Sequence, residues 1–292
     1  MDLSVIIPCY NAADTIGDQL EALAAQQWAR PWEVIVADNG SRDGSRQVVA
    51  GFTGRVPGLR IVDASARRGG AFARNQAARL AHGAALAFVD ADDVVAPGWV
   101  AAIGTALAER PFVASRFDIE RLNRDSWVSR TRTNPQADGL QRISYPPHLL
   151  HAGGCGLGIR RELHEHVGGF DEQLLRLMDT DYCFRVQLQC GVELAFVPEA
   201  VVYVRYRDTL RGMFRQTRER AAYNVYLAKR YWPAGKPHKP LRSWYLFGRR
   251  WLRHALRLGR VRSREQFAEW LRTLGWHVGI LQGSIQYKAP PL

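Results

Sequence analysis

Short β-branched runs alternate with helix-like segments over the first 110 residues, and this alternation limits the fold more than any other feature. The runs occur at residues 3–7, 34–37, 59–62 and 85–89, and apolar residues at helical spacing follow each one. Strands that alternate with helices favour an α/β domain with a mainly parallel sheet flanked by helices. The run at 85–89 contains no polar residue, so we expect a central strand buried on both faces.

Polar loops follow three of these runs, at the point where each strand is expected to end. The loops comprise residues 8–11, 38–41 and 90–93. Ligands of open α/β sheets bind outside the carboxyl ends of the strands, so we expect these loops to gather at one edge of the sheet. Residues 111–150 are less regular and rich in Arg, Asn and Pro, and we expect an edge strand at 112–119 followed by a mobile segment.

The loop Asp90-Ala-Asp-Asp93 carries the most chemical information. Several carboxylates on one turn repel one another unless they share a cation or a proton. Hard oxygen ligands suit Mg²⁺ or Mn²⁺, and such an ion neutralises charge where a diphosphate leaves. An ordinary acidic turn is the alternative, and the buried strand before the motif favours the metal.

Two other acidic segments have both a structural and a functional interpretation. The turn Asp38-Asn-Gly-Ser41 exposes backbone N–H groups, and Asp38 could accept a hydrogen bond from a nucleotide base or ribose. A plain Asx-Gly turn is the alternative. Asp179 and Asp181 precede a helical pattern, where a carboxylate either caps the helix or acts as a general base.

Six motifs follow one another along residues 3–207. They are Pro8-Cys-Tyr-Asn11, Asp38-Asn-Gly-Ser-Arg-Asp-Gly-Ser45, Arg74-Asn75, Asp90-Ala-Asp-Asp93, Val167-Gly-Gly-Phe-Asp171 and Asp179-Thr-Asp181. In this order they resemble family 2 glycosyltransferases. The resemblance implies a GT-A fold, which is Rossmann-like, together with an inverting mechanism and a nucleoside-diphosphate sugar donor.

The resemblance also implies roles for single residues in binding the donor. The nucleotide sugar would contact Pro8, Tyr10, Asn11, Asp38, Asn39, Arg74, Asp90, Arg205 and Arg207. The two last arginines lie where relatives carry a His or Arg near the diphosphate, and surface solvation is their alternative interpretation.

The metal ligands and the general base are implied in the same way. Asp92 and Asp90 match the metal-binding motif and would hold Mg²⁺ or Mn²⁺, with Asp92 as the more direct ligand. Asp179 matches the general base of the family's Glu-Asp motif. The Glu expected just before that base is Met178 here, so Asp181 remains an alternative base.

The basic residues concentrate near the C-terminus. Residues 205–264 carry a net charge of +16, whereas the rest of the chain carries −4. Such segregation indicates a polyanionic partner. We predict a catalytic domain at 1–207 and a basic, amphipathic helical extension at 208–292. The extension should contain helices at 208–231, 241–258 and from Ser263, which begins a capping box with Gln266, with a linker at 233–240.

The helix within residues 241–262 separates apolar from basic side chains. One side would hold Leu241, Trp244, Tyr245, Phe247, Gly248, Trp251, Leu252 and Ala255, and the other Arg242, Arg249, Arg250, Arg253, Arg257 and Arg260. This pattern is typical of a helix that lies in an anionic membrane interface. A helix docked on its own protein is the alternative.

The cysteines and the N-terminus favour the cytoplasm. Cys9, Cys155, Cys183 and Cys190 show neither a disulfide framework nor a zinc spacing, so we expect free thiols, mostly buried. The chain opens directly into a strand-like run, from which we expect no signal peptide. We predict a cytoplasmic protein, peripheral on the inner face of the cell membrane. His164 and His166 should lie on a solvated helix.

These features predict a metal-dependent, inverting glycosyltransferase that moves a sugar from a UDP- or dTDP-sugar to a hydroxyl of a glycan or lipid-linked acceptor. A sugar nucleotidyltransferase would need a Gly/Arg/Lys-rich loop after the first strand, where residues 8–11 stand instead. A non-catalytic module that binds nucleic acid or a membrane surface would not require three polar loops at one edge. We expect no nucleic-acid partner.

Overall fold

The computed structural model of the protein describes residues 1–233 and 240–292, which divide into two compact units. The first unit comprises Met1–Leu122, Asn134–Gln141 and Leu150–Arg205. The second comprises Asn123–Thr133, Arg142–Leu149 and Tyr206–Leu292. Two segments from within the predicted 1–207 domain therefore group with the C-terminal helices.

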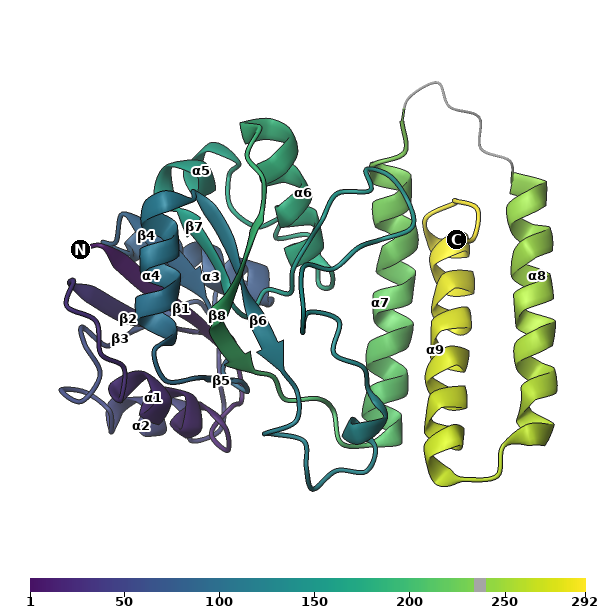
Figure 1. Cartoon of the computed structure of the whole chain (residues 1–292), viewed down its shortest axis with the longest axis horizontal. Helices are drawn as coiled ribbons and strands as arrows, with labels where there is room; N and C mark the ends of the chain where they lie inside the picture. The colour runs from purple at the N-terminus through teal and green to yellow at the C-terminus, as the bar shows by residue number, and fades with distance from the viewer. Residues whose placement is uncertain (234–239) are drawn as a thin grey trace. The chain divides into compact units, whose positions relative to one another are not determined.

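An eight-stranded sheet forms the centre of the first unit, in the order β3-β2-β1-β4-β7-β6-β8-β5 (Figure 1). The strands are β1 (Leu3–Cys9), β2 (Trp32–Asp38), β3 (Arg60–Asp63), β4 (Ala85–Phe88), β5 (Val94–Val95), β6 (Phe112–Asp118), β7 (Leu157–Arg160) and β8 (Ala195–Tyr203). The pairs β3–β2, β2–β1, β1–β4 and β6–β8 are parallel. Strand β7 runs antiparallel to both neighbours, and β5 to β8. The predicted mainly parallel sheet is confirmed.

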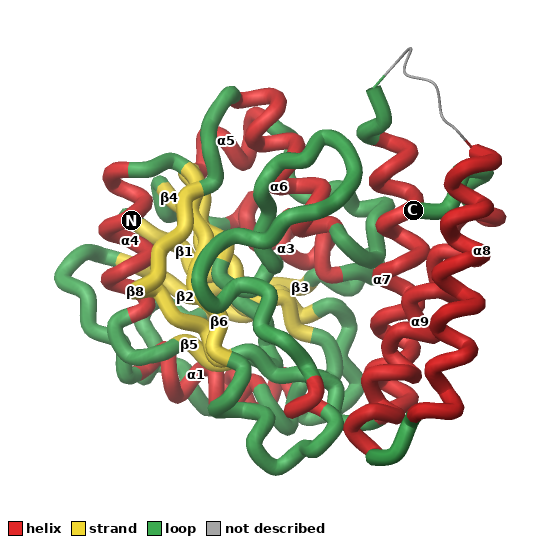
Figure 2. Tube along the Cα trace, turned by 45° about the vertical axis from the view of Figure 1, so that its right-hand side comes forward, coloured by secondary structure: helices red, strands yellow, loops and turns green. Residues whose placement is uncertain are grey.

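Helices cover both faces of this sheet (Figures 1 and 2). They are α1 (Ile16–Ala24), α2 (Ser45–Ala50), α3 (Gly70–Leu80), α4 (Trp99–Glu109), α5 (Arg161–His166) and α6 (Met178–Cys190). Leu157 and Ile159 of β7 pack in one core with α3 and α6. A Cβ added to Gly158, between them, would meet Ile103 and Leu107 of α4. Because side chains alternate along a strand, α4 lies on the face opposite α3 and α6.

The predicted edge strand at 112–119 is not at an edge. Strand β6 lies between β7 and β8, and its first residues, from Phe112, are buried. The two neighbours come from more than 30 residues further along the chain, so no local pattern could show that they enclose this strand.

Three long helices form most of the second unit: α7 (Leu210–Arg230), α8 (Pro240–Arg257) and α9 (Arg264–Gln286). Short turns η1 (Ser129–Thr131) and η2 (Leu258–Arg260) belong to the same unit. The predicted linker at 233–240 falls mostly on residues 234–239, which lie outside the described residues. Over the described chain, no helix has the length and apolar character needed to cross a membrane.

Glycines let α9 approach α7 closely. Gly275, Gly279 and Gly283 recur every fourth residue, and a Cβ added to Gly279 would lie 2.1 Å from the Arg218 carbonyl oxygen. The predicted cap of α9 is present in part, because the Ser263 hydroxyl accepts a hydrogen bond from the Gln266 N–H at 3.2 Å. The Gln266 side chain accepts from the N–H of Arg262 instead of completing the reciprocal pair.

Candidate active site

The strand register brings the three predicted loops to one edge of the sheet. Strands β2, β1 and β4 are adjacent and parallel, with Cys9 beside Asp38 and Ile6 beside Phe88. Their carboxyl ends therefore meet at the same edge, where residues 8–11, 38–41 and 90–93 follow.

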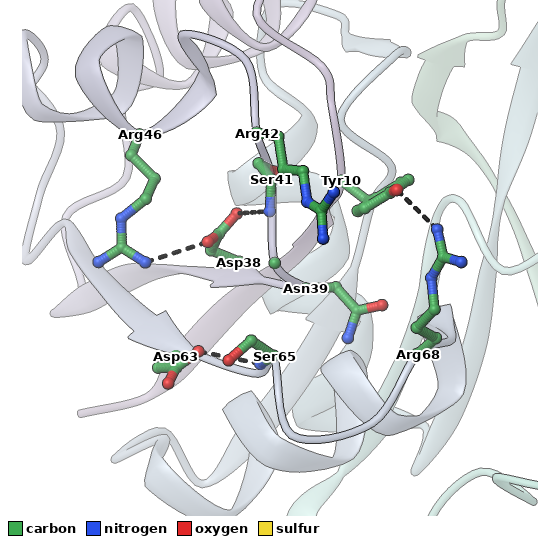
Figure 3. A pocket seen from close by; sticks show the side chains of 10 residues that line it. Tyr10, Asp38, Asn39, Ser41, Arg42, Arg46, Asp63, Ser65 and Arg68 are labelled. Atoms are coloured by element: carbon green, nitrogen blue, oxygen red, sulfur yellow. Dashed lines mark hydrogen bonds and ion pairs between the residues drawn. The ribbon is translucent and has the colours of Figure 1, made fainter.

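A cavity of about 670 Å³ lies beside the first two loops (Figure 3). Its lining consists of Tyr10, Asp38, Asn39, Gly40, Ser41, Arg42, Arg46, Asp63, Ser65 and Arg68. Three of these were predicted to bind the nucleotide: Tyr10, Asp38 and Asn39. The remaining lining residues were not predicted. They come from the loops and from the ends of α2 and β3, and no local sequence pattern indicates that these segments face one cavity.

Asp38 is buried at the end of β2, and both of its carboxylate oxygens are held. Oδ1 accepts a hydrogen bond from the Ser41 N–H at 3.2 Å, and Oδ2 accepts from Arg46 Nη1 at 3.0 Å (Figure 3). Each oxygen has a second lone pair, so the carboxylate is oriented and still able to accept from a ligand.

Tyr10 and Arg68 form the opposite side of the cavity (Figure 3). Arg68 Nη2 donates to the Tyr10 hydroxyl at 2.6 Å, and its guanidinium carbon lies 5.3 Å from the ring centroid. Tyr10 is nevertheless 45% exposed. An exposed aromatic ring beside a cation can stack on a planar base.

Asn39 and Asn11 connect the loops of this site. Asn39 Nδ2 donates to the carbonyls of Ala64 and Arg67, and Oδ1 accepts from the Gly69 N–H at 2.8 Å. Asn11 Oδ1 accepts from the N–H of Arg42 at 2.8 Å. Both amide groups are used in shaping the cavity. Pro8, a further predicted contact, lies within β1 beside Ala37 of β2.

An acidic cluster follows β4. Ligand atoms of Asp90, Asp93 and Cys155 all lie within 4.8 Å of one another. Burial, together with the neighbouring carboxylates of Asp92 and Asp90, raises the pKa of Asp93 well above its usual range. Burial likewise raises the pKa of the Cys155 thiol. Carboxylates gathered in this way favour a hard cation, so the aspartates fit the predicted Mg²⁺ or Mn²⁺, whereas the Cys155 thiol suits softer metals.

Cys155 and Asp93 were not among the predicted ligands. Asp93 is buried and accepts a hydrogen bond from the backbone N–H of Arg205 at 2.8 Å, whereas Asp90 and Asp92 are partly exposed. In the sequence, only the position of Asp93 at the end of the acidic motif indicates that it belongs to the cluster. Cys155 reaches the cluster from the segment before β7, which the sequence does not reveal.

Arg74 connects the acidic turn to helix α6. Its guanidinium forms an ion pair with Asp90, and Nη1 lies 3.9 Å from the Met178 sulfur. A Cβ added to Gly154 would lie 3.4 Å from Arg74 Nη2 and 3.5 Å from the Asp179 Cβ. Arg74 and Asp179 are therefore close neighbours, and the Asp90 turn lies beside them.

The two predicted bases differ sharply in their surroundings. Asp179, in the first turn of α6, is partly exposed and accepts from the N–H groups of Thr180 at 2.9 Å and Gly154 at 3.0 Å. Asp181 has no exposed surface, and its Oδ2 accepts from Arg185 Nε at 2.8 Å. Arg185 also donates to the carbonyls of Val167 and Gly169. Asp179 is therefore accessible at the start of α6, whereas Asp181 is enclosed and paired with Arg185.

The two arginines that were predicted to lie near the diphosphate, Arg205 and Arg207, differ in their surroundings. Arg205 donates through Nε to the Asp92 carbonyl at 3.0 Å and through Nη2 to Asp18 at 3.4 Å. It therefore lies against the acidic turn. Arg207 belongs to the second unit, where its carbonyl accepts from the Ser129 hydroxyl at 3.3 Å.

The prediction of a solvated His164 is wrong. Its Nδ1 lies 2.7 Å from the Tyr182 hydroxyl, and its ring packs against Phe88 and Phe170. Burial, with smaller contributions from nearby arginines, lowers the pKa of His164 to about 4. The three partners come from β4, α6 and the loop after α5, so the polar neighbours of His164 in sequence gave the wrong signal.

Residues 4–168 match the model of Glycosyl transferase family 2, and because this match spans more than half of the chain, the chain belongs to that family. It is 35% identical over 165 residues to the uncharacterized glycosyltransferase YibD of Escherichia coli K12, covering 56% of this chain and 46% of that protein.

Another relative carries a specific name. The UDP-Glc:alpha-D-GlcNAc-diphosphoundecaprenol beta-1,3-glucosyltransferase WfgD of Escherichia coli is 34% identical over 99 residues, which cover 34% of this chain and 36% of that protein. The chain thus spans less than half the length of either relative.

A solved structure shares the fold. The mannosyltransferase PcManGT from Pyrobaculum calidifontis, in complex with GDP-Man and Mn²⁺, aligns with a TM-score of 0.65 at 22% identity, covering 97% of this chain and 86% of that one. The predicted GT-A fold is confirmed.

Proposed function

We propose that the protein is an inverting, metal-dependent glycosyltransferase that moves a hexosyl group from a UDP- or dTDP-sugar to a hydroxyl of a glycan or lipid-linked acceptor. The observation that carries the proposal is the sheet edge itself. There Asp38 and Tyr10 line a cavity, and the Asp90 turn lies beside Arg74, which in turn neighbours Asp179.

The nucleoside would occupy the cavity beside β2. Asp38, fixed by Ser41 and Arg46, would accept a hydrogen bond from the base or ribose. Tyr10 would stack on the base, because its exposed ring lies across the cavity from Asp38. Asn11 and Asn39 would hold the loops in place.

The diphosphate would lie beside the acidic turn. Asp92 and Asp90 would hold Mg²⁺ or Mn²⁺, an ion that neutralises the charge developing on the leaving diphosphate. Arg205, which contacts the Asp92 carbonyl, would add a positive charge next to the same oxygens. Arg74 would orient the Asp90 carboxylate through their ion pair. The Mn²⁺ named with GDP-Man in PcManGT supports this arrangement.

Asp179 would act as the general base. Its carboxylate is oriented by two backbone N–H groups and remains partly exposed. It would take the proton of the acceptor hydroxyl as the hydroxyl oxygen attacks the anomeric carbon. The bond from that carbon to the diphosphate oxygen breaks as the new glycosidic bond forms, so the configuration at the carbon inverts.

Support for the proposed acceptor comes from the name of a relative. The name of WfgD specifies an alpha-D-GlcNAc-diphosphoundecaprenol acceptor, which favours a lipid-linked sugar as the acceptor here. Relatives named for teichuronic acid and succinoglycan biosynthesis favour a role in polysaccharide synthesis. We propose that residues 1–207 carry out the transfer in the cytoplasm. The basic extension at 208–292 would serve the inner face of the cell membrane.

Nucleotide binding tests the donor site directly. Thermal unfolding would be followed with UDP, dTDP, GDP and ADP, each with and without Mn²⁺. Because a ligand that binds the native state raises its stability, UDP or dTDP with Mn²⁺ should raise the Tm most. Asp38→Ala should abolish the shift, whereas Asp63→Ala, across the same cavity, should keep most of it. Equal shifts in the two variants, or none in the wild type, would refute the donor site.

A further inference from the structure

The apolar side predicted for helix α8 is only partly exposed. Part of it is buried against other helices of the same unit. Phe247 packs with Val225 and Ile280, and Trp251 lies against this core. His254 is buried and stacks on Trp270 and His277 of α9. These residues make the inner face of the helix, so the alternative of a helix docked on its own protein holds for this face.

A second apolar face of α8 remains uncovered. Leu241, Tyr245, Leu252 and Leu256 are between 60% and 86% exposed. At about 100° per residue their spacing places all four within a strip roughly 60° wide along the helix. We call these four residues the outer stripe. It runs beside the inner face and has no counterpart among the exposed residues of α7, whose large apolar side chains are at least partly buried.

Arginines lie directly beside the outer stripe. Arg242, Arg249 and Arg253 project next to it in the same helical rotation, and the Arg249 guanidinium carbon lies 5.7 Å from the Tyr245 ring centroid. Residues 240–262 contain seven arginines and no Asp or Glu. The helix therefore has an inner face, an exposed apolar stripe and a basic row.

We propose that the outer stripe and its arginine row bind the surface of an anionic phospholipid bilayer, with α8 lying in the plane of the interface. The four apolar side chains would enter the boundary between headgroups and acyl chains. The arginines beside them would contact lipid phosphates, to which a guanidinium group donates paired hydrogen bonds.

Other occupants fit this surface less well. A second copy of the chain would bring two arginine rows together, and like charges across an interface disfavour association. A nucleic acid would pair with the arginines but leave the exposed leucines without an apolar partner. A bilayer with anionic headgroups satisfies the apolar stripe and the basic row at once.

The inference rests on the proposed function in one respect only. If the acceptor is lipid-linked, a helix in the interface would keep the protein beside the bilayer that contains that acceptor. The binding surface consists of residues of α8 only, so vesicle binding and nucleotide binding test separate properties.

Co-sedimentation with vesicles tests the surface. The full chain should pellet with phosphatidylglycerol vesicles and stay in solution with phosphatidylcholine vesicles. Arg249→Glu/Arg253→Glu should lower the partition coefficient at least about tenfold, since each basic residue contributes to attraction by an anionic surface. The control Arg110→Glu/Arg124→Glu makes the same change in net charge at exposed positions outside α8 and should bind like the wild type.

The apolar stripe is tested with a second pair of variants. Leu252→Ser/Leu256→Ser should weaken vesicle binding severalfold, whereas Leu80→Ser/Leu188→Ser, at exposed positions of α3 and α6, should not. Circular dichroism and the thermal shift with UDP would be recorded for every variant, so that loss of folding is recognised and nucleotide binding is followed independently.

Three results would overturn the inference. One is a wild-type chain that ignores phosphatidylglycerol vesicles while it still responds to UDP. Another is equal loss of binding in the α8 charge variant and its control, which would indicate attraction by net charge alone. The third is a dimer, detected by light scattering, that Leu252→Ser/Leu256→Ser dissociates in a chain that does not bind vesicles. That result would assign the surface to a second copy.

Discussion

Arg74 of helix α3 forms an ion pair with Asp90 of the acidic turn that follows strand β4. Arg74 is almost fully buried, and its guanidinium carbon lies 5.6 Å from the Phe170 ring centroid. The pair joins the proposed metal loop to the neighbourhood of Asp179. One buried arginine therefore neighbours both the proposed metal loop and the proposed general base.

Removing this arginine should cost stability. Arg74→Ala leaves Asp90 without its charged partner beside Asp92 and Asp93, and hydrogen bonds to charged groups contribute about 1.5–3 kcal/mol. We expect the free energy of unfolding in urea to fall by about 2 kcal/mol. Arg79→Ala, at an exposed position of the same helix, should change it by less than about 0.5 kcal/mol. Equal effects of the two substitutions would mean that the buried pair does not hold the turn.

Asp181 should matter for folding more than for chemistry. Asp181→Ala removes the charged partner of Arg185 at a place where the pair is almost completely buried. Breaking a buried pair in this way costs about 3–5 kcal/mol. Urea unfolding of the variant should show this loss. A variant as stable as the wild type would remove Asp181 from its structural role.

The buried His164 predicts a dependence of stability on pH. Its pKa in the folded protein is about 4, below the 6.5 of an exposed histidine, so the unfolded chain binds the proton more strongly. The contribution of His164 is therefore complete above pH 6.5 and is lost as the pH falls toward 4. Between pH 7 and pH 5 this should lower the free energy of unfolding by about 2 kcal/mol.

A substitution isolates this contribution. His164→Gln keeps a polar group near the Tyr182 hydroxyl but cannot take up the proton. Urea unfolding at pH 7 and at pH 5 should show a smaller loss in the variant than in the wild type, by about the same 2 kcal/mol. The same loss in both proteins would show that other groups dominate this pH range.

The close approach of α9 to α7 gives a prediction for the second unit. Gly279→Ala would place a methyl group 2.1 Å from the Arg218 carbonyl oxygen, so the helices must separate. We expect thermal unfolding of this unit to show a loss of about 1–3 kcal/mol. Gly248→Ala in α8 meets nothing within 4 Å and should stabilise its helix by about 0.5–1 kcal/mol. The reverse order of stabilities would contradict the described packing.

The local parts of the fold and site followed from the sequence. Strands with buried β-branched residues were located closely, since β2 ends at Asp38 and the predicted run ends at Ala37. Parallel pairing then brings Asp38 and Asp90 to one edge. These positions depend on residues that are close together along the chain. The order of strands on the far side of β4 depends on the return of β7 and β8, so the interior position of β6 could not be predicted.

Contacts between side chains from distant segments could not be predicted from the sequence either. Cys155 meets Asp93, and Arg68 meets Tyr10 across 58 positions of sequence, without any local spacing to indicate it. The division of α8 into an inner face and an outer stripe depends on where α9 packs. A projection of one helix shows which residues are apolar, but not which of them a neighbouring helix covers.

Sugar transfer by Asp179→Asn tests most directly whether Asp179 is the general base of the proposed reaction. The wild type, Asp179→Asn and Asp181→Asn would be assayed with a radiolabelled UDP-sugar, Mn²⁺ and a bacterial lipid extract as acceptor, at a temperature where all three are folded. Loss of a general base typically lowers the rate by about 10²–10⁴-fold. We predict such a loss for Asp179→Asn with an unchanged thermal shift by UDP, and substantial transfer by Asp181→Asn. Transfer by Asp179→Asn at the wild-type rate would contradict the assignment of the site.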